Sequence, residues 1–434
     1  MSVLVTGGDD RSMLAAARSL SRQGVSFAVM GPGHDSMVGR SRYVRPHMLP
    51  PAPSPKLEPE RYVEFILDVV KRFGVELVLP LTDSSLYACD LQRDAIEAVT
   101  RLAAPPSPAL RNVLDKRANL ETARRLGIPC PDQFDLERLD QIPQLIEELG
   151  FPIVLKNPDR PRARLGSPFD FRWLVARNEV ELRRHISETC SSGEFPLFQR
   201  LVTGTVQNVC CFAVDGEMVA AHQYRGLRRV HGLTVFREIT PLARDLETYA
   251  ESMLRELQWQ GVAILGFFVR ESDGDARYME TNARLWASTE GSVAAGWDFP
   301  RWLYEYFALG KSPQSPPRSL GLGRLSRWHY GEFEALVQFL GGGDEPSGAG
   351  RTRTRAIAEY VSGFHPRVDA DVFRIDDPLP ELVEHWRGVR SLGLGRGLMR
   401  RAWRGLRPGR KRSHGDGTPR QPGGPEIEFS GLSD

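Results

Sequence analysis

Two apolar segments joined by a short polar turn constrain the fold of this chain more strongly than any other part of its sequence. Residues 260–269 are almost entirely apolar, and residues 272–275 contain the Asp-Gly pair that is typical of tight turns between strands. The pattern predicts a β-hairpin whose second strand ends in Glu280, Asn282 and Arg284. Because alternate residues of a strand point to one face, we expect a carboxylate, a carboxamide and a guanidinium to lie side by side there.

These three side chains allow two interpretations. Carboxylate and amide oxygens are ligands of Mg²⁺, which proteins usually hold through one or two carboxylates together with substrate phosphates. A neighbouring arginine would bind phosphate or carboxylate oxygens through paired hydrogen bonds. The same residues are also compatible with the polar end of an ordinary surface hairpin, and this stretch alone leaves both interpretations open.

Length and composition limit the classes of protein to which the chain can belong. With 434 residues, 41% of them apolar and 26% charged, it has the composition of a soluble globular protein of two to three domains. A net charge of +2 gives no overall attraction to nucleic acid. The five cysteines are scattered without metal-ligand spacing, which indicates reduced intracellular thiols. No segment approaches the roughly 20 apolar residues of a membrane helix and no signal peptide is evident, so we expect a cytoplasmic protein.

The N-terminal region alternates between strand and helix patterns. A strand over residues 3–6, a helix over 11–22 and a strand over 25–30 predict a β-α-β unit of a doubly wound α/β domain. A Gly-Gly turn follows the first strand, but the complete GxGxxG fingerprint is absent. Asp9 and Asp10 would also repel a pyrophosphate, so the pattern argues against a dinucleotide site.

Polar side chains follow two further predicted strands. Asp83 comes after the strand over residues 75–81, where open α/β sheets bind ligands, and it either contacts a substrate or caps the next helix. Lys156 ends an apolar strand, which places its ammonium group at the edge of a sheet, usually facing an anion. The basic loop over residues 157–172 is long enough to form a mobile cover.

A cationic cluster follows the predicted Asp-Gly hairpin at residues 215–216. Its members are Arg225, Arg228, Arg229 and Arg237. We expect this cluster either to bind a second anion or to form a solvated surface.

The C-terminal region holds a second basic segment. Residues 387–412 contain about ten arginines and lysines interleaved with leucine, methionine and tryptophan. This composition fits an interfacial helix on anionic lipid, a nucleic-acid patch or a solvated tail, and four glycines between residues 393 and 405 weaken any helix. Residues 413–434 are expected to be disordered.

Several of these features occur in one order along the chain. A Leu-Asp-Lys helix start at 114–116 precedes the strand ending in Lys156, a strand at 198–202 followed by a glycine, the Asp-Gly hairpin, and Glu-x-Asn-x-Arg at 280–284. Over about residues 1–310 this order resembles the ATP-grasp superfamily, in particular its carbamoyl-phosphate-synthase-like and predicted carboxylate–amine ligase branches. The sequence from Asn282 through Ser288 is similar to the latter branch.

The resemblance implies an N-terminal doubly wound α/β domain followed by a two-subdomain ATP-grasp fold of α/β and α+β class. The expected divisions are an N-terminal domain (1–112), a lid subdomain (113–195), a nucleotide- and metal-binding subdomain (196–310), a C-terminal extension (311–386) and a basic tail (387–434).

The resemblance also implies roles for individual residues. Lys116 and Lys156 would contact the nucleotide phosphates, Glu280 and Asn282 would hold Mg²⁺ or Mn²⁺, and Arg284 would face the transferred phosphoryl group or a substrate carboxylate. The backbone of a hinge segment would bind adenine, and its residues are Gln199, Arg200, Leu201 and Val202.

The implied activity is that of an ATP- and Mg²⁺-dependent ligase, which activates a carboxylate as an acyl phosphate and joins it to an amine. The sequence departs from the family pattern at Gly266, where a metal-binding Glu or Gln is usual, and at Gln199 and Arg200, where an acidic residue is common. It also has Asn-Ala-Arg where Asn-Pro-Arg is frequent. Two alternatives therefore stand beside the ligase: an ATP-binding regulatory module with little or no turnover, and a phosphotransferase.

Overall fold

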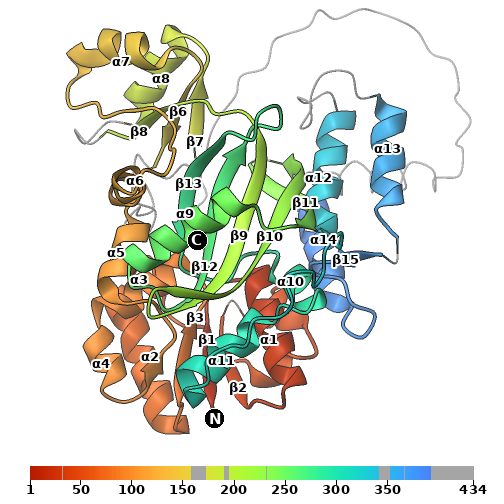
Figure 1. The fold of residues 1–434 in the computed structure, drawn as a ribbon. Helices are drawn as coiled ribbons and strands as arrows, with labels where there is room; N and C mark the ends of the chain where they lie inside the picture. Colours follow the sequence, from red (N-terminus) through yellow and green to blue (C-terminus); the bar gives the residue numbers. More distant parts are fainter. Residues whose placement is uncertain are drawn as a thin grey trace, which may run out of the picture. The chain divides into compact units, whose positions relative to one another are not determined.

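A computed structural model describes residues 1–31, 33–157, 173–189, 195–230, 232–341, 352–365 and 367–391 of the chain. The chain divides into two compact units, Met1–Gly388 and Val389–Asp434. The described part of the first unit contains three β-sheets and the helices that cover them (Figure 1).

The N-terminal sheet is parallel, with its strands in the order β2-β1-β3-β4. Its elements are β1 (Val3–Thr6), α1 (Arg11–Arg22), β2 (Phe27–Met30), the 3₁₀ helices η1 (Val38–Arg40) and η2 (Arg45–His47), α2 (Pro59–Phe73), β3 (Leu77–Pro80), α3 (Asp83–Leu91), α4 (Arg93–Glu97) and β4 (Arg101–Leu102). The apolar strands β1, β2 and β3 are buried, with α1 packed on one face and α2 on the other. This arrangement confirms the expected doubly wound α/β domain.

A second sheet of four antiparallel strands has the order β5-β8-β6-β7. Helices α5 (Ser107–Leu114) and α6 (Lys116–Arg125) precede it, and its elements are β5 (Gln133–Phe134), η3 (Leu139–Gln141), α7 (Ile142–Leu149), β6 (Ile153–Lys156), β7 (Trp173–Ala176), α8 (Glu179–Thr189) and β8 (Leu197–Arg200). The sequence predicts a subdomain boundary between residues 195 and 196. Because β8 pairs with both β5 and β6, this sheet instead continues to Arg200.

The third sheet has seven strands in the order β13-β12-β9-β10-β11-β14-β15. Its elements are β9 (Thr205–Val214), β10 (Glu217–Val230), β11 (Leu233–Thr240), α9 (Arg244–Glu256), β12 (Gly261–Val269), β13 (Ala276–Asn282), α10 (Thr289–Ala294), α11 (Phe299–Leu309), β14 (Leu325–Arg327) and β15 (Val368–Ala370). Helix α9 packs on one face, whereas α11 and the N-terminal helix α1 belong to the apolar cluster on the other. The hairpin predicted over residues 260–284 is the β12–β13 pair.

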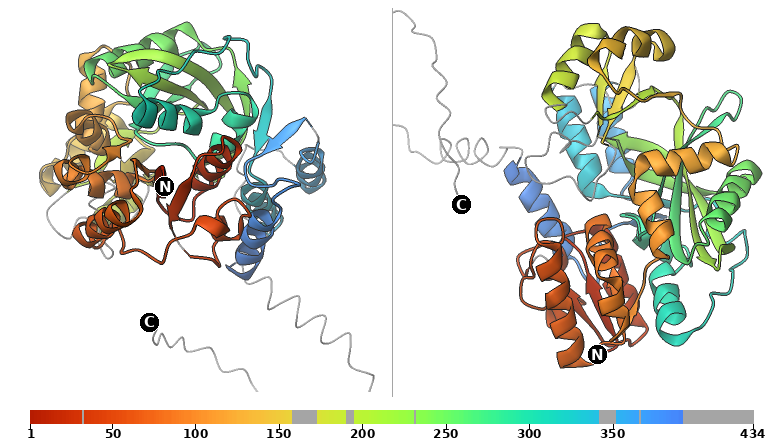
Figure 2. Two further views of the ribbon diagram at one scale, coloured as in Figure 1. Left: turned by 90° about the horizontal axis from the view of Figure 1, so that it is seen from below. Right: turned by 90° about the vertical axis from the view of Figure 1, so that its left-hand side faces the viewer.

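The region after residue 310 is part of the fold and not an appendage to it. Strands β14 and β15 extend the large sheet, and helices α12 (His329–Leu340), α13 (Arg353–Ser362) and α14 (Leu379–Ser391) accompany them. Figure 2 shows these C-terminal elements, in blue, beside the N-terminal elements, in red. A fully buried ion pair joins Arg18 of α1 to Asp377, with 2.9 Å between Nη2 and Oδ2. The expected C-terminal extension therefore closes against the N-terminal domain.

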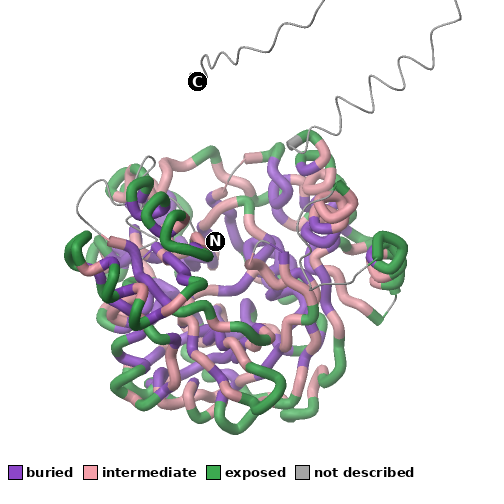
Figure 3. The backbone as a smooth tube through the Cα atoms, turned by 90° about the horizontal axis from the view of Figure 1, so that it is seen from above, coloured by how far each residue is buried: buried purple, intermediate pink, exposed green. Residues whose placement is uncertain are grey.

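Burial follows the same organisation, since β1, β2 and β3 are buried along their whole length and the exposed residues lie mainly at the periphery (Figure 3). Among the described cysteines, Cys89, Cys130, Cys210 and Cys211 are free thiols. Within the described ranges, none of the helices combines the length and apolar character that crossing a bilayer requires.

Candidate functional site

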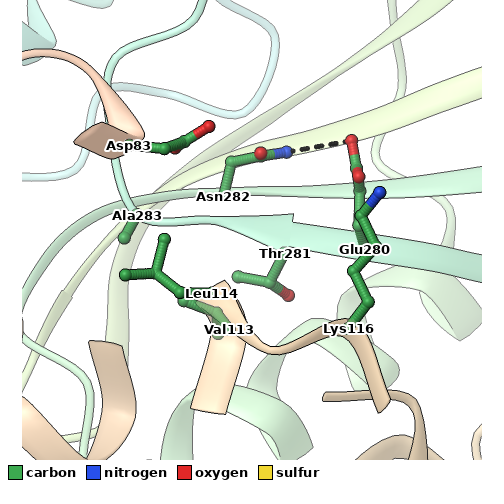
Figure 4. Close-up of a pocket in the computed structure, with 8 residues that line it drawn as sticks. All are labelled: Asp83, Val113, Leu114, Lys116, Glu280, Thr281, Asn282 and Ala283. Carbon is green, nitrogen blue, oxygen red and sulfur yellow. Dashed lines mark hydrogen bonds between the residues drawn. The ribbon is translucent and has the colours of Figure 1, made fainter. Parts of the chain in front are cut away.

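The strand that carries Glu280 and Asn282 has a bulge next to them. Gly266 pairs with Glu280, but the following residue of β12, Phe267, pairs with Tyr278, so β13 contains one extra residue. Figure 4 shows the side chains of Glu280 and Asn282 on one side of the strand. The alternation expected from the sequence therefore holds for these two residues.

A pocket lies at this polar end of β13. It is lined by Asp83, Val113, Leu114, Lys116, Glu280, Thr281, Asn282 and Ala283. The carboxamide of Asn282 donates a hydrogen bond from Nδ2 to Oε1 of Glu280 over 3.3 Å. The side chain of Lys116 extends toward the Glu280 carboxylate (Figure 4). The structure thus brings together three residues for which the resemblance implies phosphate and metal binding.

Helix α6 fixes the position of Lys116 relative to the strand. Asp115 caps this helix by accepting hydrogen bonds from two backbone N–H groups of its first turn, so Lys116 is its first residue. One turn further, Oδ1 of Asn119 accepts hydrogen bonds from the Tyr278 hydroxyl (2.6 Å) and the Thr281 N–H (3.3 Å). These buried contacts lock α6 to β13, which holds the lysine opposite the polar end of the strand.

Arg284 lies just beyond β13 and forms an ion pair with Asp83, with 2.9 Å between Nε and Oδ1. Its Nη1 also donates to the carbonyl of Leu285. The nearby carboxylate of Asp83 is the main cause of a raised pKa of Arg284, and Asp10 adds to it. Arg284 therefore remains charged, and any phosphate that it binds has to compete with Asp83.

The pairing corrects one of our expectations about Asp83. The cap of α3 is Thr82, whose hydroxyl accepts the Ser85 N–H while the Ser85 hydroxyl accepts the Thr82 N–H. Asp83 is the first residue of the helix, which leaves its side chain available for Arg284. The hypothesis that Asp83 caps the helix is therefore wrong, whereas contact with a substrate stays a prediction.

Gly266 occupies the position next to Glu280 where the family usually has an acidic or amide side chain. A Cβ atom at this position would lie 3.0 Å from the Met279 methyl group and 3.2 Å from Oδ1 of Asn208. Neighbouring side chains therefore fill part of the space of the missing ligand. In the part of the chain that the structure describes, no group of three or more His, Cys, Asp or Glu residues could hold a metal ion.

Lys156 ends β6, as predicted, where it pairs in register with Trp173. The indole of Trp173 faces the turn between β10 and β11, since a Cβ on Gly232 would lie 2.9 Å from its Nε1. Among the described residues, those lining the pocket at β13 do not include Lys156. Contact of Lys156 with the same triphosphate stays a prediction.

The predicted adenine hinge lies at the end of β8. The N–H of Arg200 donates to Asp132, and that of Leu201 to Pro152, both within the small sheet. Gln199 is buried and its side chain donates to Gln133. The backbone donors of Arg200 and Leu201 are thus already used, and the predicted adenine contact would have to involve the carbonyl groups of this segment or Val202.

Arg237 does not belong to an open anion site. It is buried and forms a two-pronged ion pair with Asp371 of the C-terminal region, with Nη1–Oδ1 at 2.7 Å and Nη2–Oδ2 at 2.9 Å. Burial alone would lower the pKa of Arg237, but the Asp371 carboxylate raises it overall. Arg237 therefore attaches the C-terminal region to strand β11 through Asp371.

The other three arginines of the cationic cluster have different surroundings. Arg225 pairs with Glu238 at 3.0 Å, and Arg228 pairs with Glu332 of α12. The guanidinium of Arg229 lies 5.1 Å from the centre of the Phe268 ring, and burial lowers its pKa. A single anion site made of all four arginines is therefore wrong, because carboxylates already neutralise three of them. The basic loop that was expected to cover the site lies almost wholly outside the described residues.

Two partners of the site residues were not predicted from the sequence. Asp83 was considered without Arg284, and Asn119 was not considered at all. Asn119 contacts β13 and Asp83 contacts Arg284 just beyond it, both from elements far away in the chain. No local pattern marks an asparagine or aspartate in a helix as the partner of such a distant residue. One signal in the sequence could have pointed to Asn119, because this residue lies about one helical turn after Lys116 and therefore on the same face of α6.

Sequence comparison with known proteins finds a short region of similarity. No protein-family model matches the sequence. A segment of 126 residues is 31% identical to the carbamoyl phosphate synthase large chain of Thermus thermophilus. That match spans 28% of this chain and only 12% of the carbamoyl phosphate synthase chain.

Solved structures match over a larger part of the chain. The biotin carboxylase domain of Hydrogenobacter thermophilus 2-oxoglutarate carboxylase has a TM-score of 0.58 at 15% identity, over 75% of this chain and 73% of that domain. N5-carboxyaminoimidazole ribonucleotide synthetase from Thermus thermophilus has a TM-score of 0.56 at 17% identity, over 74% of this chain and 81% of that protein. Both are ATP-grasp enzymes. This chain therefore has the ATP-grasp fold that its sequence motifs indicated.

Proposed function

We propose that this protein is an ATP-dependent ligase that uses Mg²⁺, activates a carboxylate as an acyl phosphate and joins it to an amine. The observation that carries the proposal is the convergence of Lys116, Glu280 and Asn282 on one pocket of an ATP-grasp fold. These residues come from two different elements, and their charges suit a metal–phosphate complex.

The residues present fit a magnesium ion that is held mainly by phosphate. One carboxylate and one carboxamide match the small number of protein ligands that Mg²⁺ uses when a nucleotide supplies the others. In the structure Asn282 directs its NH₂ group to Glu280. Its carboxamide has to turn over to offer Oδ1 to a cation beside Glu280. When bound, the ion would neutralise phosphate charge during the transfer.

The chain's own residues supply binding and charge stabilisation. Lys116, held by α6, would contact phosphate oxygens, and Lys156 is proposed as a second phosphate contact from the small sheet. Arg284 would bind the γ-phosphate or the substrate carboxylate once its ion pair with Asp83 is broken. In each of these roles a positioned positive charge lies near the negative charge that develops on the transferred phosphoryl group. Such charges stabilise the transition state of phosphoryl transfer.

The reaction balances as two substitutions. A carboxylate oxygen forms a bond to the γ-phosphorus while the bond from that phosphorus to the β–γ bridging oxygen breaks, which releases ADP. The amine nitrogen then attacks the acyl carbon, inorganic phosphate leaves and the nitrogen loses a proton. The similar proteins support this class of chemistry, since they include a carboxylase, a synthetase and a carbamoyl phosphate synthase, and the carboxylase domain was solved with MgADP and bicarbonate.

A second function is favoured by Gly266. Without a second acidic ligand the site would hold the metal weakly, and a nucleotide-binding regulatory module with little turnover would result. A third candidate function of the same site is that of a phosphotransferase, which releases the phosphorylated product and does not join it to an amine.

Release of ADP distinguishes the three functions. We would measure it with pools of carboxylates and amines, supplied singly and together with MgATP. Release that requires both pools supports the ligase, whereas release with the carboxylate alone and recovery of a stable phosphorylated product supports the phosphotransferase. Tight MgATP binding without turnover under every combination would overturn the ligase in favour of the binding module.

A further inference from the structure

A second pocket lies between the edge of the large sheet and the end of helix α13. It has a volume of about 490 Å³, within the range of roughly 300–1,000 Å³ that small-molecule sites occupy. Strands β10, β11, β14 and β15 and helices α12 and α13 contribute to its walls, and Figure 1 shows α12 and α13 side by side next to this part of the sheet. The described residues that line it are different from those that line the pocket at β13, so it is a separate cavity that the proposed reaction does not use.

The wall that β11, β14 and β15 contribute is apolar. It consists of Phe236 of β11, Leu325 of β14 and Val368 of β15, which are all half-buried. The three strands are neighbours, and their register puts these three side chains on one face of the sheet. An apolar group of a ligand would cover them and gain the free energy of apolar burial.

A buried cation lies directly behind another wall of the pocket. A Cβ on Gly363, which lines the pocket, would collide with Nη1 of Arg327. Arg327 is fully buried, and its guanidinium lies 4.7 Å and 4.8 Å from the ring centres of Tyr360 and Phe364. It pairs through Nε with Glu332, whereas Nη1 and Nη2 donate to no acceptor among the described residues. A buried guanidinium with two unused nitrogens favours an anion in the adjoining pocket.

The two carboxylates that line the pocket are both paired. Glu332 pairs with Arg228 as well as with Arg327. Glu359 pairs with Arg355 at 2.9 Å and lies 3.8 Å from Arg228. Two carboxylates are therefore shared among three arginines, and this part of the pocket keeps a positive charge.

The mouth of the pocket adds hydrogen-bond donors. Arg367 is exposed there, and its side chain forms no ion pair with any carboxylate in the described ranges. Nδ1 of His365 accepts the Arg367 backbone N–H over 3.2 Å, so the proton of a neutral His365 ring is on Nε2, which can donate to a ligand. One further carboxylate, Glu381 of α14, acts on Arg327 but is itself paired with His329 at 3.1 Å. Arginines thus outnumber carboxylates around the pocket.

We propose that this pocket binds a small organic anion, a phosphate ester or a carboxylate that carries an apolar group. Arg367 and His365 would hold the negative group, with the charge of Arg327 behind it. The apolar group would lie on the wall of Phe236, Leu325 and Val368. This proposal does not depend on the ATP-dependent reaction, because the two pockets share none of the described residues.

Calorimetric titration of the full chain with phenyl phosphate tests the proposal. Phenyl phosphate should bind about ten-fold or more tightly than inorganic phosphate, which leaves the apolar wall uncovered. Arg367→Ala should weaken its binding by about five-fold or more, since the substitution removes the unpaired guanidinium. Leu325→Asn, which keeps the size of the side chain, should weaken the binding of phenyl phosphate but not of inorganic phosphate.

Two control variants locate the binding. Arg45→Ala removes an exposed arginine of η2 and should bind phenyl phosphate like the wild type. Lys116→Ala alters the pocket at β13 and should also leave this affinity unchanged. Benzoate replaces phenyl phosphate in a parallel titration, and the tighter of the two identifies the ligand as a carboxylate or a phosphate ester.

Four results would overturn the proposal. The first is that neither phenyl phosphate nor benzoate binds, and the second is unchanged affinity in a folded Arg367→Ala variant. The third is loss of binding in Lys116→Ala, which would place the probe in the pocket at β13. The fourth is tighter binding of benzylammonium than of phenyl phosphate, which would make the pocket a site for cations.

Discussion

At the scale of single residues, the contact between Arg284 and Asp83 sets the state of the candidate site. The two residues are 201 positions apart and about a fifth exposed, and their ion pair occupies the guanidinium that a phosphate would need. A partly exposed pair of this kind contributes about 1 kcal/mol or less to stability. A triphosphate that carries several negative charges can therefore displace Asp83.

Asp83→Asn tests this exchange. Removal of the carboxylate should release Arg284 toward phosphate and tighten the binding of a non-hydrolysable ATP analogue by about five-fold, which corresponds to roughly 1 kcal/mol. The measurement is a calorimetric titration in the presence of Mg²⁺. Asp94→Asn, on the exposed side of α4, should leave the affinity unchanged. Weaker binding by Asp83→Asn would mean that Asp83 orients Arg284 for the nucleotide instead of competing with it.

The sequence predicted the members of the site whose signal is local. Glu280 and Asn282 were predicted because two alternate polar residues end an apolar strand, whereas the role of Lys116 was implied only by the order of motifs that resembles the ATP-grasp superfamily. Partners that come from elsewhere in the chain were not predictable in this way. No local sequence pattern around Asp83 or Asn119 indicates which residues they contact, and only the folded structure shows these contacts.

At the level of elements, helix α14 carries a titrating group, Glu384, on the side that contacts the start of α12. Burial is the main cause that raises the pKa of Glu384 to about 8, and the nearby carboxylates of Glu381 and Asp371 also raise it. Arg11 and the hydrogen bond from Trp328 act in the opposite direction and lower it. In the unfolded chain a glutamate titrates near about pH 4.3. Between these two values the folded protein keeps a proton that the unfolded chain has lost. The contribution of Glu384 to the free energy of unfolding therefore falls as the pH rises from about 4.3 to about 8, and is constant above.

Glu384→Gln should remove this pH dependence. The variant keeps the uncharged form at every pH, so its free energy of unfolding should equal that of the wild type near about pH 4.5 and exceed it at about pH 8.5 by on the order of 5 kcal/mol. Urea denaturation across this range measures the difference. Glu64→Gln, on the exposed side of α2, provides the control. Parallel curves for wild type and Glu384→Gln would contradict a raised pKa.

The elements beyond residue 310 were the least predictable part of the fold. Strands β14 and β15 have only three residues each, too few for an alternation of apolar and polar residues to be recognised. Longer elements, such as β12 and α1, were predicted because their apolar patterns extend over about nine residues or more. The extra residue in β13 was also not predictable, since a bulge depends on how two strands pair.

At the scale of the whole molecule, buried ion pairs hold the N-terminal domain and the C-terminal region of the first unit together. Asp377 accepts hydrogen bonds from Arg18, from the Ser41 hydroxyl and from the Arg42 N–H. Asp371 receives both Arg11 and Arg237. Each of these carboxylates satisfies buried cations that would otherwise remain uncompensated.

Asp377→Ala should therefore destabilise the protein strongly. It leaves the fully buried guanidinium of Arg18 without its carboxylate, and the expected loss is about 3–5 kcal/mol in the free energy of unfolding. Chemical denaturation measures the loss. Asp376→Ala changes the neighbouring residue, whose ion pair with Arg374 is exposed, and should cost about 1 kcal/mol or less. Equal effects of the two substitutions would contradict a structural role for the buried pair.

Truncation separates the tail from the rest of the molecule. Because α14 extends to Ser391 and Arg387 pairs with Asp9, the cut belongs after residue 391 and not at the predicted boundary after residue 386. The shortened chain should bind MgATP with unchanged affinity, because every residue assigned to the site precedes the cut. A ten-fold loss of affinity in a folded truncated protein would assign the tail a part in nucleotide binding.

The proposed function requires that the pocket of Lys116, Glu280 and Asn282 binds the phosphates and metal of ATP. Calorimetric titration of a non-hydrolysable ATP analogue measures this binding. Lys116→Ala should weaken binding at least ten-fold with and without Mg²⁺, and Glu280→Gln should abolish the gain in affinity that Mg²⁺ gives the wild type. Lys311→Ala and Glu271→Gln, both at exposed residues, should behave like the wild type. Unchanged affinity and unchanged Mg²⁺ dependence in Lys116→Ala and Glu280→Gln would contradict the account.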